Sequence, residues 1–581
     1  MARNKEKNSH VNQNSLKGRL ILVSILFALF GAGIVGRLFS LQVMQHDDLV
    51  SRSEKQHQRT VEIHYGRGSV FDRNMNELAT NIKAESVYAT PQKVVDKKRA
   101  ARVLAKALNL NHKSIYKKLN SKRHFVWLKR QVLPAEIARL RKSSLPGINF
   151  ISEDKRFFPK RELASGVVGF NGVDNQGLGG IEQRYDSTLK GNVVKAVMEK
   201  DARGKLVQFN KQANGQVSGS RSVVLAIDEV IQFFTEHHLK KQVAKHQAES
   251  GVAIVMNPNT GELYAIANVP QYNPNNYSAY KDNRRRNRAV SDSYEPGSIF
   301  KPIVAAASID AGVARPQDTF FCENGKFKVG NKTVGEAVNH KYGWLTLQDI
   351  IVKSSNIGSI KIARQLGKQS YYDYIRKFGF GQKTGIELPG EEGGLLHELS
   401  AWDPMSLASI SFGQGIGVTP LQMTNAISAI ANGGTLMVPR ITRAILKDGQ
   451  IEKRFEPKAV RRVISIQSSR QVIDILKHVV KDGTGKNAAV KGYEVAGKTG
   501  TAQKYDAKTG RYSKTAYVSS FIGFAPADAA KVAILVMIDN PKGAHYGGSV
   551  AAPVFSNIAR ETLRYLNVPS SDQRVYILDR A

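Results

Sequence analysis

The apolar pattern of this chain begins with one uninterrupted run, Leu20–Gly36, of seventeen uncharged and almost wholly apolar residues. As an α-helix rising about 1.5 Å per residue, the run just crosses a thin hydrocarbon layer, and Leu38–Val43 extends it if Arg37 reaches the interface. No cleavage site of the small-x-small type follows, so the run does not fit a removed signal peptide. We therefore predict an uncleaved transmembrane helix at residues 20–42.

Beyond this helix, changes in apolar pattern and composition predict several domains, as the length of 581 residues allows. Short strand patterns and a basic helical stretch near Lys97–Leu119 come first. The segment Asn210–Ser220 then contains Gly, Ser and Asn and marks a domain boundary. The predicted limits are a polar tail at 1–19, the helix at 20–42, an α+β pedestal at 43–218, a larger domain at 219–565 and a second polar tail at 566–581.

The larger domain combines apolar strands with helices. Strands are predicted at Gly251–Met256, Val518–Ala525 and Val532–Ile538, and helices after Ser298 and after Thr346. Helices packed around a largely antiparallel sheet account for this order of elements. The predicted fold class is therefore mixed α/β, with this domain joined to the α+β pedestal and one transmembrane helix.

The chain is strongly basic, with 85 Lys and Arg against 49 Asp and Glu and a formal net charge of +36. The first nineteen residues hold five of these basic residues and one acid, Glu6, which predicts a cytoplasmic N-terminus with the bulk of the chain outside. A nucleic-acid partner does not fit that location, and the basic residues are spread along the chain. Anionic lipid head groups or cell-wall polymers are the better interpretation, and Arg284–Arg286 reads as a solvated cluster.

The single cysteine, Cys322, agrees with an exported chain that forms no internal disulfide. Its neighbours, Phe320, Phe321 and Glu323, include no histidine that would make it a nucleophile. We therefore predict a packing role for Cys322. Neither a metal nor a cofactor is expected.

Three short motifs in the larger domain carry candidate chemistry: Ser298–Lys301 (SIFK), Ser354–Asn356 (SSN) and Lys498–Thr501 (KTGT). Each motif is weak alone. Together they supply a hydroxyl nucleophile, two lysines and a strand that can stabilise an oxyanion. Acyl transfer through a serine ester uses this set of groups.

The surroundings of the motifs separate them from chance copies. Other Ser-x-x-Lys matches begin at Ser114, Ser187 and Ser278. A second Lys-Thr-Gly, Lys508–Gly510, has the composition of a polar turn. The Ser298 copy alone follows a turn signal, Tyr294–Gly297, and opens an apolar helix, Pro302–Gly312. At a helix start the free N–H groups and the dipole favour an anion near Ser298, with Lys301 on the same face.

The expected roles follow from the chemistry of each group. Ser298 is the expected nucleophile and Lys301 its base, because burial and the nearby charge of Lys498 would both lower the pKa of the Lys301 amine. The backbone N–H groups of Ser298 and Thr501 would form an oxyanion hole worth about 3–4 kcal/mol per donor. The other expected roles are proton relay by Ser354, orientation of Lys301 and of a substrate amide by Asn356, binding of a substrate carboxylate by Lys498, Thr499 and Thr501, and close approach of the substrate backbone at Gly500.

Ordinary structural roles compete with these assignments when each motif is taken alone. Ser354 and Ser355 suit a helix cap, and Asn356 suits a turn or a cap. The occurrence of all three motifs in order, each in a fitting context, favours the catalytic interpretation.

With these motifs, the sequence resembles the penicillin-binding proteins, the serine D,D-transpeptidases of bacterial cell-wall synthesis. The resemblance covers most of residues 20–560. It implies cross-linking of peptidoglycan stem peptides through an acyl-serine, with β-lactams as inhibitors. Further segments that resemble the family are Gly413–Ile416, Val418–Pro420, Gly483–Gly485 and Tyr546–Pro553, with Arg67–Arg73 and Gly179–Glu182 in the pedestal.

The resemblance also implies a branch of the family. Class A members carry a glycosyltransferase signature, Glu-Asp-x-x-Phe-x-x-His, whereas here Glu153–Lys160 ends in lysine. No glycosyltransferase is therefore expected, and Arg156 and Pro159 match the Arg-x-x-Pro element of class B. Glu295 and Asn356 are similar to the division-type (FtsI, penicillin-binding protein three) members, since elongation-type relatives more often have Pro and Asp there.

Division-type membership implies a single-pass protein of the bacterial inner membrane with its catalytic domain in the periplasm. It also implies divisome partners that include a lipid-carrier glycan polymerase. Three alternatives stay open: an elongation-type transpeptidase, a D,D-carboxypeptidase or β-lactamase that uses water, and a penicillin-binding sensor or scaffold. A class A β-lactamase would need a glutamate for deacylation, for which Glu391 and Glu392 are only guesses.

Overall fold

Two compact units divide the chain, Met1–Tyr65 with Asn192–Ser218 and Gly66–Gly191 with Gly219–Ala581. The computed structural model describes residues 13–50, 58–64, 66–191, 193–200, 206–209, 220–506 and 509–570. Several sequence predictions lie outside the described residues: most of the tail at 1–19, most of the boundary Asn210–Ser220, Lys508, and residues 571–581 of the second tail.

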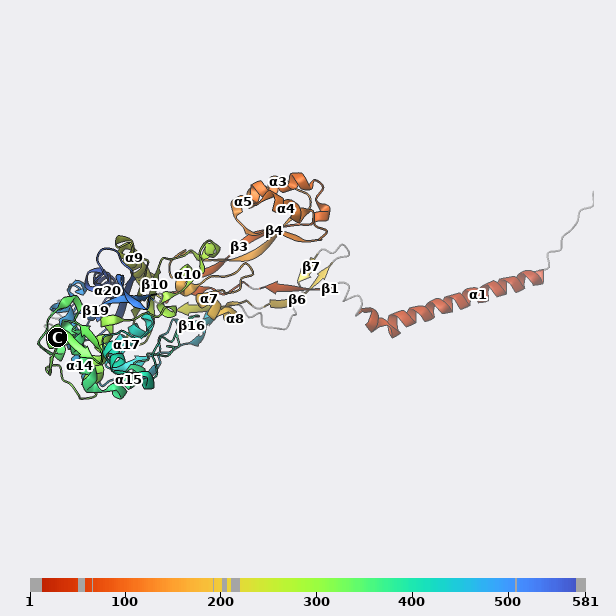
Figure 1. Cartoon of the computed structure of the whole chain (residues 1–581). Coiled ribbons are helices and arrows are strands. Elements are labelled where there is room, and N and C mark those ends of the chain that lie inside the picture. The colour runs from red at the N-terminus through yellow and green to blue at the C-terminus, as the bar shows by residue number, and fades with distance from the viewer. Residues whose placement is uncertain are drawn as a thin grey trace, which may run out of the picture. The chain divides into compact units, whose positions relative to one another are not determined.

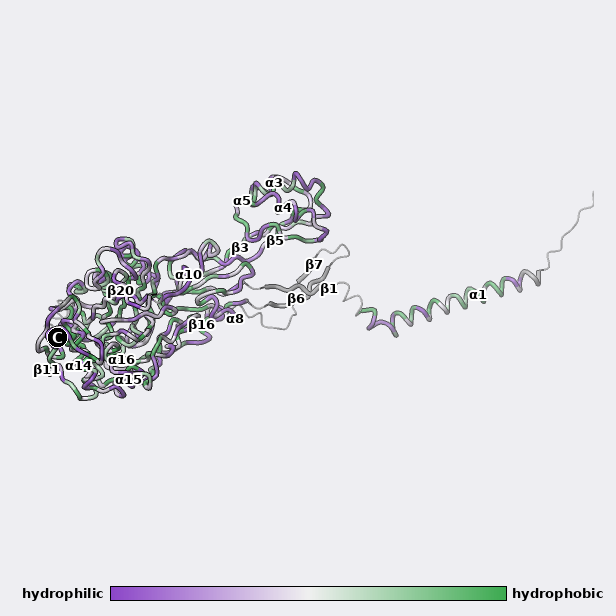
Figure 2. Tube along the Cα trace, viewed as in Figure 1, coloured by the Kyte–Doolittle hydropathy of each residue, from purple (hydrophilic) through white to green (hydrophobic). Residues whose placement is uncertain are grey.

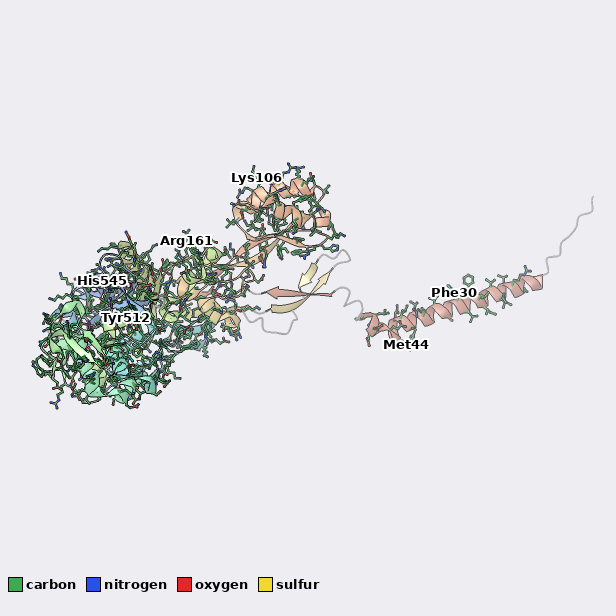
Figure 3. The ribbon with its side chains drawn as sticks, in the orientation of Figure 1. Phe30, Met44, Lys106, Arg161, Tyr512 and His545 are labelled. Carbon is green, nitrogen blue, oxygen red and sulfur yellow. The ribbon has the colours of Figure 1, made fainter. Side chains whose placement is uncertain are left out.

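The first unit contains a long apolar helix, α1 (Gln13–Phe39), which continues into a short π-helical segment, η1 (Ser40–Met44). Within the stretch Lys17–Met44, an 18-residue window has a mean hydropathy of 2.2, and none of its residues is buried. Figure 2 shows its apolar residues along the helix, and Figure 3 shows the Phe30 and Met44 side chains on it. Among the described residues it is the one helix long and apolar enough to cross a membrane, in agreement with the predicted anchor.

The same unit contains a small antiparallel sheet in the order β1 (Gln58–His64), β6 (Val193–Lys200) and β7 (Leu206–Phe209). In the register of the first pair, Gln58 lies opposite Glu199 and His64 opposite Val193. Strands from the two ends of the predicted pedestal therefore meet in one sheet.

The centre of the second unit is a five-stranded sheet in which every neighbouring pair is antiparallel, as predicted. Its order is β10 (Leu263–Val269), β9 (Ser250–Met256), β21 (Val532–Asp539), β20 (Arg511–Ala525) and β19 (Ala496–Asp506). Alternate residues of β9 enter opposite cores, with Val252 and Ile254 in one and Ala253 and Val255 in the other. Both faces of the sheet are therefore covered, and β19 is left as an edge strand.

Helices cover the two faces of this sheet (Figure 1). On one face α9 (Glu229–Lys245) packs against α20 (Ala552–Tyr565). The core on the other face includes α12 (Lys301–Asp310), α17 (Pro420–Ala431) and α18 (Ile466–Lys481). α12 is buried along almost its whole length, which fixes the position of the residues at its start.

A second sheet joins residues 66–191 to the larger domain. Its path is β17 (Gln450–Arg454), β16 (Thr442–Lys447), β8 (Arg221–Leu225), β2 (Val70–Phe71), β3 (Glu77–Ala89) and β4 (Val126–Val132), with β5 (Ile148–Phe157) also paired to β3. The β2–β8 pair is parallel, and the other pairs are antiparallel. Because β3 pairs with β2 near its start and with β4 and β5 further on, it ties these parts into one unit.

Residues 91–150, which we call the basic lobe, form a separate small core on this sheet (Figure 1). α3 (Lys97–Leu108), α4 (His112–Leu119) and α5 (Pro134–Arg141) pack there, so the predicted basic helical stretch consists of two helices. Leu104 and Leu108 of α3 are fully buried, one turn apart on the same helix face.

Short elements complete the second unit. The helical ones are η2 (Pro91–Lys93), α6 (Ser165–Val168), α7 (Gly180–Arg184), α8 (Asp186–Leu189), η3 (Pro274–Ala279), α10 (Asp282–Arg285), α11 (Arg288–Ser291), η5 (Glu323–Gly325), η6 (Ala337–Asn339), α15 (Lys368–Lys377), η7 (Leu399–Ala401), α16 (Pro404–Ser411), η8 (Lys486–Ala488) and α19 (Gly547–Val550). The strands are β11 (Thr319–Phe321), β12 (Lys326–Val329), β13 (Lys332–Gly335), β14 (Trp344–Thr346), β15 (Thr435–Met437) and β18 (Ala459–Arg462).

Candidate active site

Ser298 lies in a single 3₁₀ turn, η4 (Gly297–Phe300), directly before α12. The sequence predicted an α-helix start at this point, whereas the α-helix itself begins at Lys301. Ile299 and Phe300 are fully buried, and the Phe300 ring packs on Phe380 with centroids 5.0 Å apart. These two apolar side chains anchor the turn and leave Ser298 half-buried at its surface.

Glycines let the neighbouring segments close on this turn. The Gly297 N–H donates to the Gly413 carbonyl at 2.9 Å, and a Cβ on Gly413 would lie 2.1 Å from the Gly297 oxygen. A Cβ on Gly500 of β19 would lie 2.8 Å from Ile299 Cγ2 and 2.4 Å from Ser520 Oγ. Side chains at residues 413 and 500 would therefore displace the turn from the edge strand.

Lys301 is fully buried, and the groups that its amine contacts are uncharged. Its Nζ donates to the Ser354 carbonyl at 2.6 Å, to Ser354 Oγ at 3.2 Å and to Asn356 Oδ1 at 2.9 Å. Burial lowers the pKa of the Lys301 amine to about 7, and the charge of Glu336 opposes that change. The amine is therefore poised to exchange a proton near neutral pH.

Lys498, on β19, is also fully buried, and its amine contacts the hydroxyl of Ser354 as well. Its Nζ donates to Ser354 Oγ at 3.0 Å and to the Thr499 carbonyl at 3.0 Å. Burial and repulsion by Lys301 hold the Lys498 pKa well below its usual value. The predicted lowering of the Lys301 pKa is thus present with burial as its cause, while repulsion between the two amines acts on Lys498.

Ser354 lies in the link between α13 (Leu347–Val352) and α14 (Asn356–Leu366), with φ at +61°. Residues other than glycine seldom adopt that left-handed conformation, which here turns the hydroxyl toward the two lysines. Ser355 is the N-cap of α14, and its Oγ accepts from the Gly358 N–H at 2.9 Å. The helix-cap role considered for both serines therefore belongs to Ser355.

Glu336 is a site residue that the sequence analysis missed. It is 8% exposed, and its carboxylate accepts from the Asn356 N–H at 2.6 Å, from the Ile357 N–H at 3.3 Å and from Ser355 Oγ. An anion at this point stabilises the first turn of α14, where N–H groups lack helical partners. No motif marks Glu336, because folding brings it to Asn356 across 20 positions of sequence.

The side chain of Asn356 faces the Lys301 amine, as predicted for an orienting residue. Its Oδ1 accepts from Lys301 Nζ at 2.9 Å, and its Nδ2 donates to the Gly335 carbonyl at 3.1 Å. The amide is thereby fixed between the start of α14 and the strand that precedes Glu336.

The KTGT strand is supported from two neighbouring segments. Thr499 Oγ1 shares a hydrogen bond of 2.7 Å with Thr484 Oγ1, a contact that the sequence analysis did not predict. Thr501 Oγ1 accepts from the Gly547 N–H at 3.0 Å. The segments Gly483–Gly485 and Tyr546–Pro553 therefore hold the two threonine side chains of the edge strand in place.

Glu295 ties the turn before Ser298 to two other segments. Its Oε1 accepts from the Gly415 N–H at 2.8 Å and from the Tyr512 hydroxyl at 3.0 Å. Tyr512, which is labelled in Figure 3, belongs to β20. The β19–β20 hairpin is thereby linked to the nucleophile turn, and burial raises the pKa of the Glu295 carboxyl.

Two other residues considered in the sequence have local structural contacts. Glu391 accepts from the Thr384 N–H at 2.6 Å and from the Gly385 N–H at 3.2 Å. These hydrogen bonds stabilise a local turn. Cys322 is fully buried, and its Sγ accepts from Ser355 Oγ at 3.6 Å. No group of three or more His, Cys, Asp or Glu in the described ranges is arranged to hold a metal ion.

Two domain families match the chain. The penicillin binding protein transpeptidase domain matches residues 251–560, and the penicillin-binding protein dimerisation domain matches residues 62–223. The chain therefore belongs to the class B penicillin-binding proteins, which confirms the resemblance found in the sequence.

Individual relatives agree with this class along almost the whole chain. The peptidoglycan D,D-transpeptidase FtsI of Escherichia coli is 33% identical over 573 residues, covering 97% of this chain and 94% of the relative. Stage V sporulation protein D of Bacillus subtilis is 34% identical over 565 residues, covering 96% and 87%. The protein is therefore a class B peptidoglycan D,D-transpeptidase, an enzyme of a family that binds peptidoglycan substrate and β-lactams.

Solved structures show the same fold. Penicillin-binding protein 3 of Mycobacterium tuberculosis in complex with aztreonam superposes with a TM-score of 0.68 at 30% identity, covering 88% of this chain and 98% of that one. A peptidoglycan synthetase of Bifidobacterium adolescentis superposes with a TM-score of 0.70 at 28% identity, with the same coverage. The mixed α/β fold predicted from the sequence is thus confirmed.

Proposed function

We propose that the enzyme cross-links peptidoglycan stem peptides at the division septum through an acyl-serine intermediate on Ser298. One observation carries the mechanism: the hydroxyl of Ser354 bridges the buried amines of Lys301 and Lys498, at 3.2 and 3.0 Å. This chain of hydrogen bonds begins at the lysine three residues after Ser298, and it gives a proton a path across the site.

Acylation would begin with attack by Ser298 Oγ on the carbonyl carbon of the penultimate D-alanine. The hydroxyl proton passes to the neutral amine of Lys301. Because the pKa of this amine is about 7, a large fraction of it is uncharged at neutral pH. The N–H groups of Ser298 and Thr501 would stabilise the oxygen that becomes negative, a contribution of about 3–4 kcal/mol per donor.

The leaving D-alanine needs a proton as its C–N bond breaks. Lys301 and Lys498 both donate to Ser354 Oγ, so that hydroxyl can pass a proton from their side of the site to the departing nitrogen. A stem-peptide amine would then attack the ester carbon and give up a proton to the base. Ser298 leaves as the free hydroxyl, and the new amide bond is the cross-link.

Substrate binding is proposed along the edge of β19. An edge strand exposes unpaired backbone groups, to which an extended peptide can add as a further strand. Because Thr501 Oγ1 accepts from Gly547, its own proton is free for a substrate oxygen. Lys498, Thr499 and Thr501 would hold the terminal carboxylate, and Gly500 lets the substrate backbone approach.

The septal role is supported by the sequence around the site and by relatives. Glu295 and Asn356 are similar to division-type members, and the E. coli relative FtsI covers 97% of the chain. We further propose that α1 anchors the protein in the inner membrane with a cytoplasmic N-terminus. The catalytic domain would then be periplasmic and work with divisome partners, including a lipid-carrier glycan polymerase.

Labelling with a fluorescent penicillin, followed by mapping of the modified residue, tests the mechanism. We expect label on Ser298 and none on the Ser298→Ala protein. Label that persists in that variant would contradict the assignment. Products from a pentapeptide donor and an amine acceptor separate transpeptidation from hydrolysis, because water as acceptor releases D-alanine without forming a cross-link.

Depletion of the protein in its host tests the septal role. We expect filaments that elongate without dividing. Cells that become round or wide while still dividing would assign the enzyme to elongation.

A further inference from the structure

The basic lobe is the most unevenly charged part of the chain. Residues 91–150 hold sixteen Lys and Arg but only two acidic residues, Asp96 and Glu136. Both acids are engaged locally: Asp96 accepts from the Arg99 N–H at 2.9 Å, and Glu136 pairs with Lys129 at 2.8 Å. The lobe therefore carries an excess of fourteen positive charges, out of +36 for the whole chain.

The unpaired charges lie on the outer faces of the lobe helices. Arg102 and Lys106 of α3 and Lys113 and Lys117 of α4 are exposed, while the apolar faces of both helices enter the lobe core. Figure 3 shows Lys106 on the outside of the lobe. Within the part of the chain that the structure describes, ion pairs of lobe residues involve Lys129, Arg130 and Arg141 alone.

The distribution of these charges favours a repeating polyanion over a small ligand. The exposed basic residues are spread over two helices and the loop that follows them, where Lys122 and Arg123 are also exposed. Many weak contacts to repeated charges add up on a surface of this kind, while each one alone binds little. Such binding also weakens as salt screens the charges.

The place of the lobe in its own unit favours the cell wall as its partner. β3 ties the lobe to the unit that contains Ser298, the proposed site of reaction on peptidoglycan. We propose that the basic lobe binds peptidoglycan strands through the repeated carboxylates of their stem peptides. This inference rests on the proposed function, since it places the lobe on the polymer that the enzyme cross-links.

Co-sedimentation with purified peptidoglycan sacculi tests the proposal. The full chain is held in discs of uncharged lipid and measured at about 0.1 M salt, where exposed charges still act over about 10 Å. The lobe variant combines Arg102→Gln, Lys106→Gln, Lys113→Gln and Lys117→Gln, because glutamine keeps helix propensity while removing charge. The matched control removes four exposed charges elsewhere, with Lys453→Gln, Arg454→Gln, Lys458→Gln and Lys491→Gln.

We expect the lobe variant to lose about tenfold or more of the sacculus affinity, and the control to stay within about twofold. A charge-preserving variant, Arg102→Lys with Lys106→Arg, Lys113→Arg and Lys117→Arg, should bind like the wild type. Equal losses in the lobe variant and the control, or no binding of the wild type, would overturn the proposal. So would binding to anionic phosphatidylglycerol vesicles without binding to sacculi, which would assign the surface to a membrane.

Penicillin labelling of Ser298 separates this proposal from the proposed function. All variants should be labelled at the wild-type rate, since the substituted residues lie outside the catalytic centre. Intact labelling with unchanged sacculus binding would defeat the lobe proposal alone. Sacculus binding through the lobe with no labelling of Ser298 would defeat the proposed mechanism alone.

Discussion

Two groups of buried charges in the second unit differ in how those charges are paired. In the pedestal, the fully buried Glu182 accepts from Arg67 Nε at 2.6 Å and from Arg156 Nε at 2.7 Å. In the proposed catalytic centre, Lys301 and Lys498 face a hydroxyl, carbonyl groups and an amide, and neither is paired with a carboxylate among the described residues. Both groups are almost fully removed from water.

The comparison shows that pairing decides whether a buried charge is structural or reactive. Burial lowers the pKa of Arg156, Glu182 opposes that change, and a guanidinium starts so high that it stays charged. Burial lowers the Lys301 pKa to about 7, and hydrogen bonds to neutral groups do not restore it. One cluster therefore fixes the fold, and the other can exchange protons.

The largest effect should come from removing the amine of Lys301, the proposed base. Lys301→Met should slow acylation by fluorescent penicillin about 10³-fold, because a general base typically contributes 10²–10⁴. The melting temperature should stay or rise, since an unpaired buried charge is removed. Stopped-flow labelling and thermal melts measure both. A variant that keeps its acylation rate would assign the base elsewhere.

Removing the Glu182 carboxylate from the pedestal should lower stability and leave the acylation rate unchanged, which is the opposite of the effect of Lys301→Met. Glu182→Gln leaves the buried Arg156 guanidinium without its carboxylate and leaves Arg67 with Asp186 alone, which should cost about 3–5 kcal/mol of unfolding free energy. The acylation rate of the folded protein should not change. Glu452→Gln, in the exposed pair with Arg221, is the control and should leave the unfolding free energy nearly unchanged. Similar losses in the two variants would contradict the distinction.

A smaller effect should come from Glu336, whose charge partly offsets burial at Lys301. The acylation rate of the wild type should rise with pH through about 7 and then level off, because the base acts when neutral. Glu336→Gln removes the charge that raises the Lys301 pKa, so this rise should move to lower pH. The plateau should fall about tenfold, because glutamine leaves the first turn of α14 with one of its two acceptor oxygens.

Ser355→Ala provides the control for that prediction. It removes the hydroxyl contact to Glu336 but keeps the carboxylate charge. Its acylation rate should rise over the same pH range as that of the wild type. A shift of equal size in both variants would assign the effect to the position of α14 rather than to charge.

The smallest effect should come from the threonine pair behind the edge strand. Thr484→Val removes the hydrogen bond to Thr499 Oγ1, worth about 1 kcal/mol, and should weaken acylation by roughly fivefold. Thr509→Val, on the exposed β19–β20 turn, should leave the rate unchanged. Steady-state labelling of both proteins measures the difference.

Local spacing explains what the sequence could predict about the site. Lys301 follows Ser298 within one turn, and the SSN and KTGT motifs each lie at the start of a helix or within a strand. Apolar runs likewise predicted three strands of the central sheet and the long apolar helix α1. These features depend on residues close together in sequence, so their pattern is visible in the chain.

Contacts made by folding explain what the sequence could not predict. Glu336 reaches α14 from a separate strand connection, and Tyr512 reaches Glu295 across 217 positions. The cap role of Ser355 and the left-handed backbone of Ser354 depend on how α13 and α14 meet. The 3₁₀ turn at Ser298 likewise depends on the packing of Ile299 and Phe300.

The glycine at residue 500 limits how this enzyme can evolve away from its inhibitors. Any side chain at residue 500 would clash with Ile299 and Ser520. A single replacement there would therefore move the turn that holds Ser298. If the natural peptide binds along β19 as proposed, the glycine that admits its backbone also admits compounds that imitate that backbone.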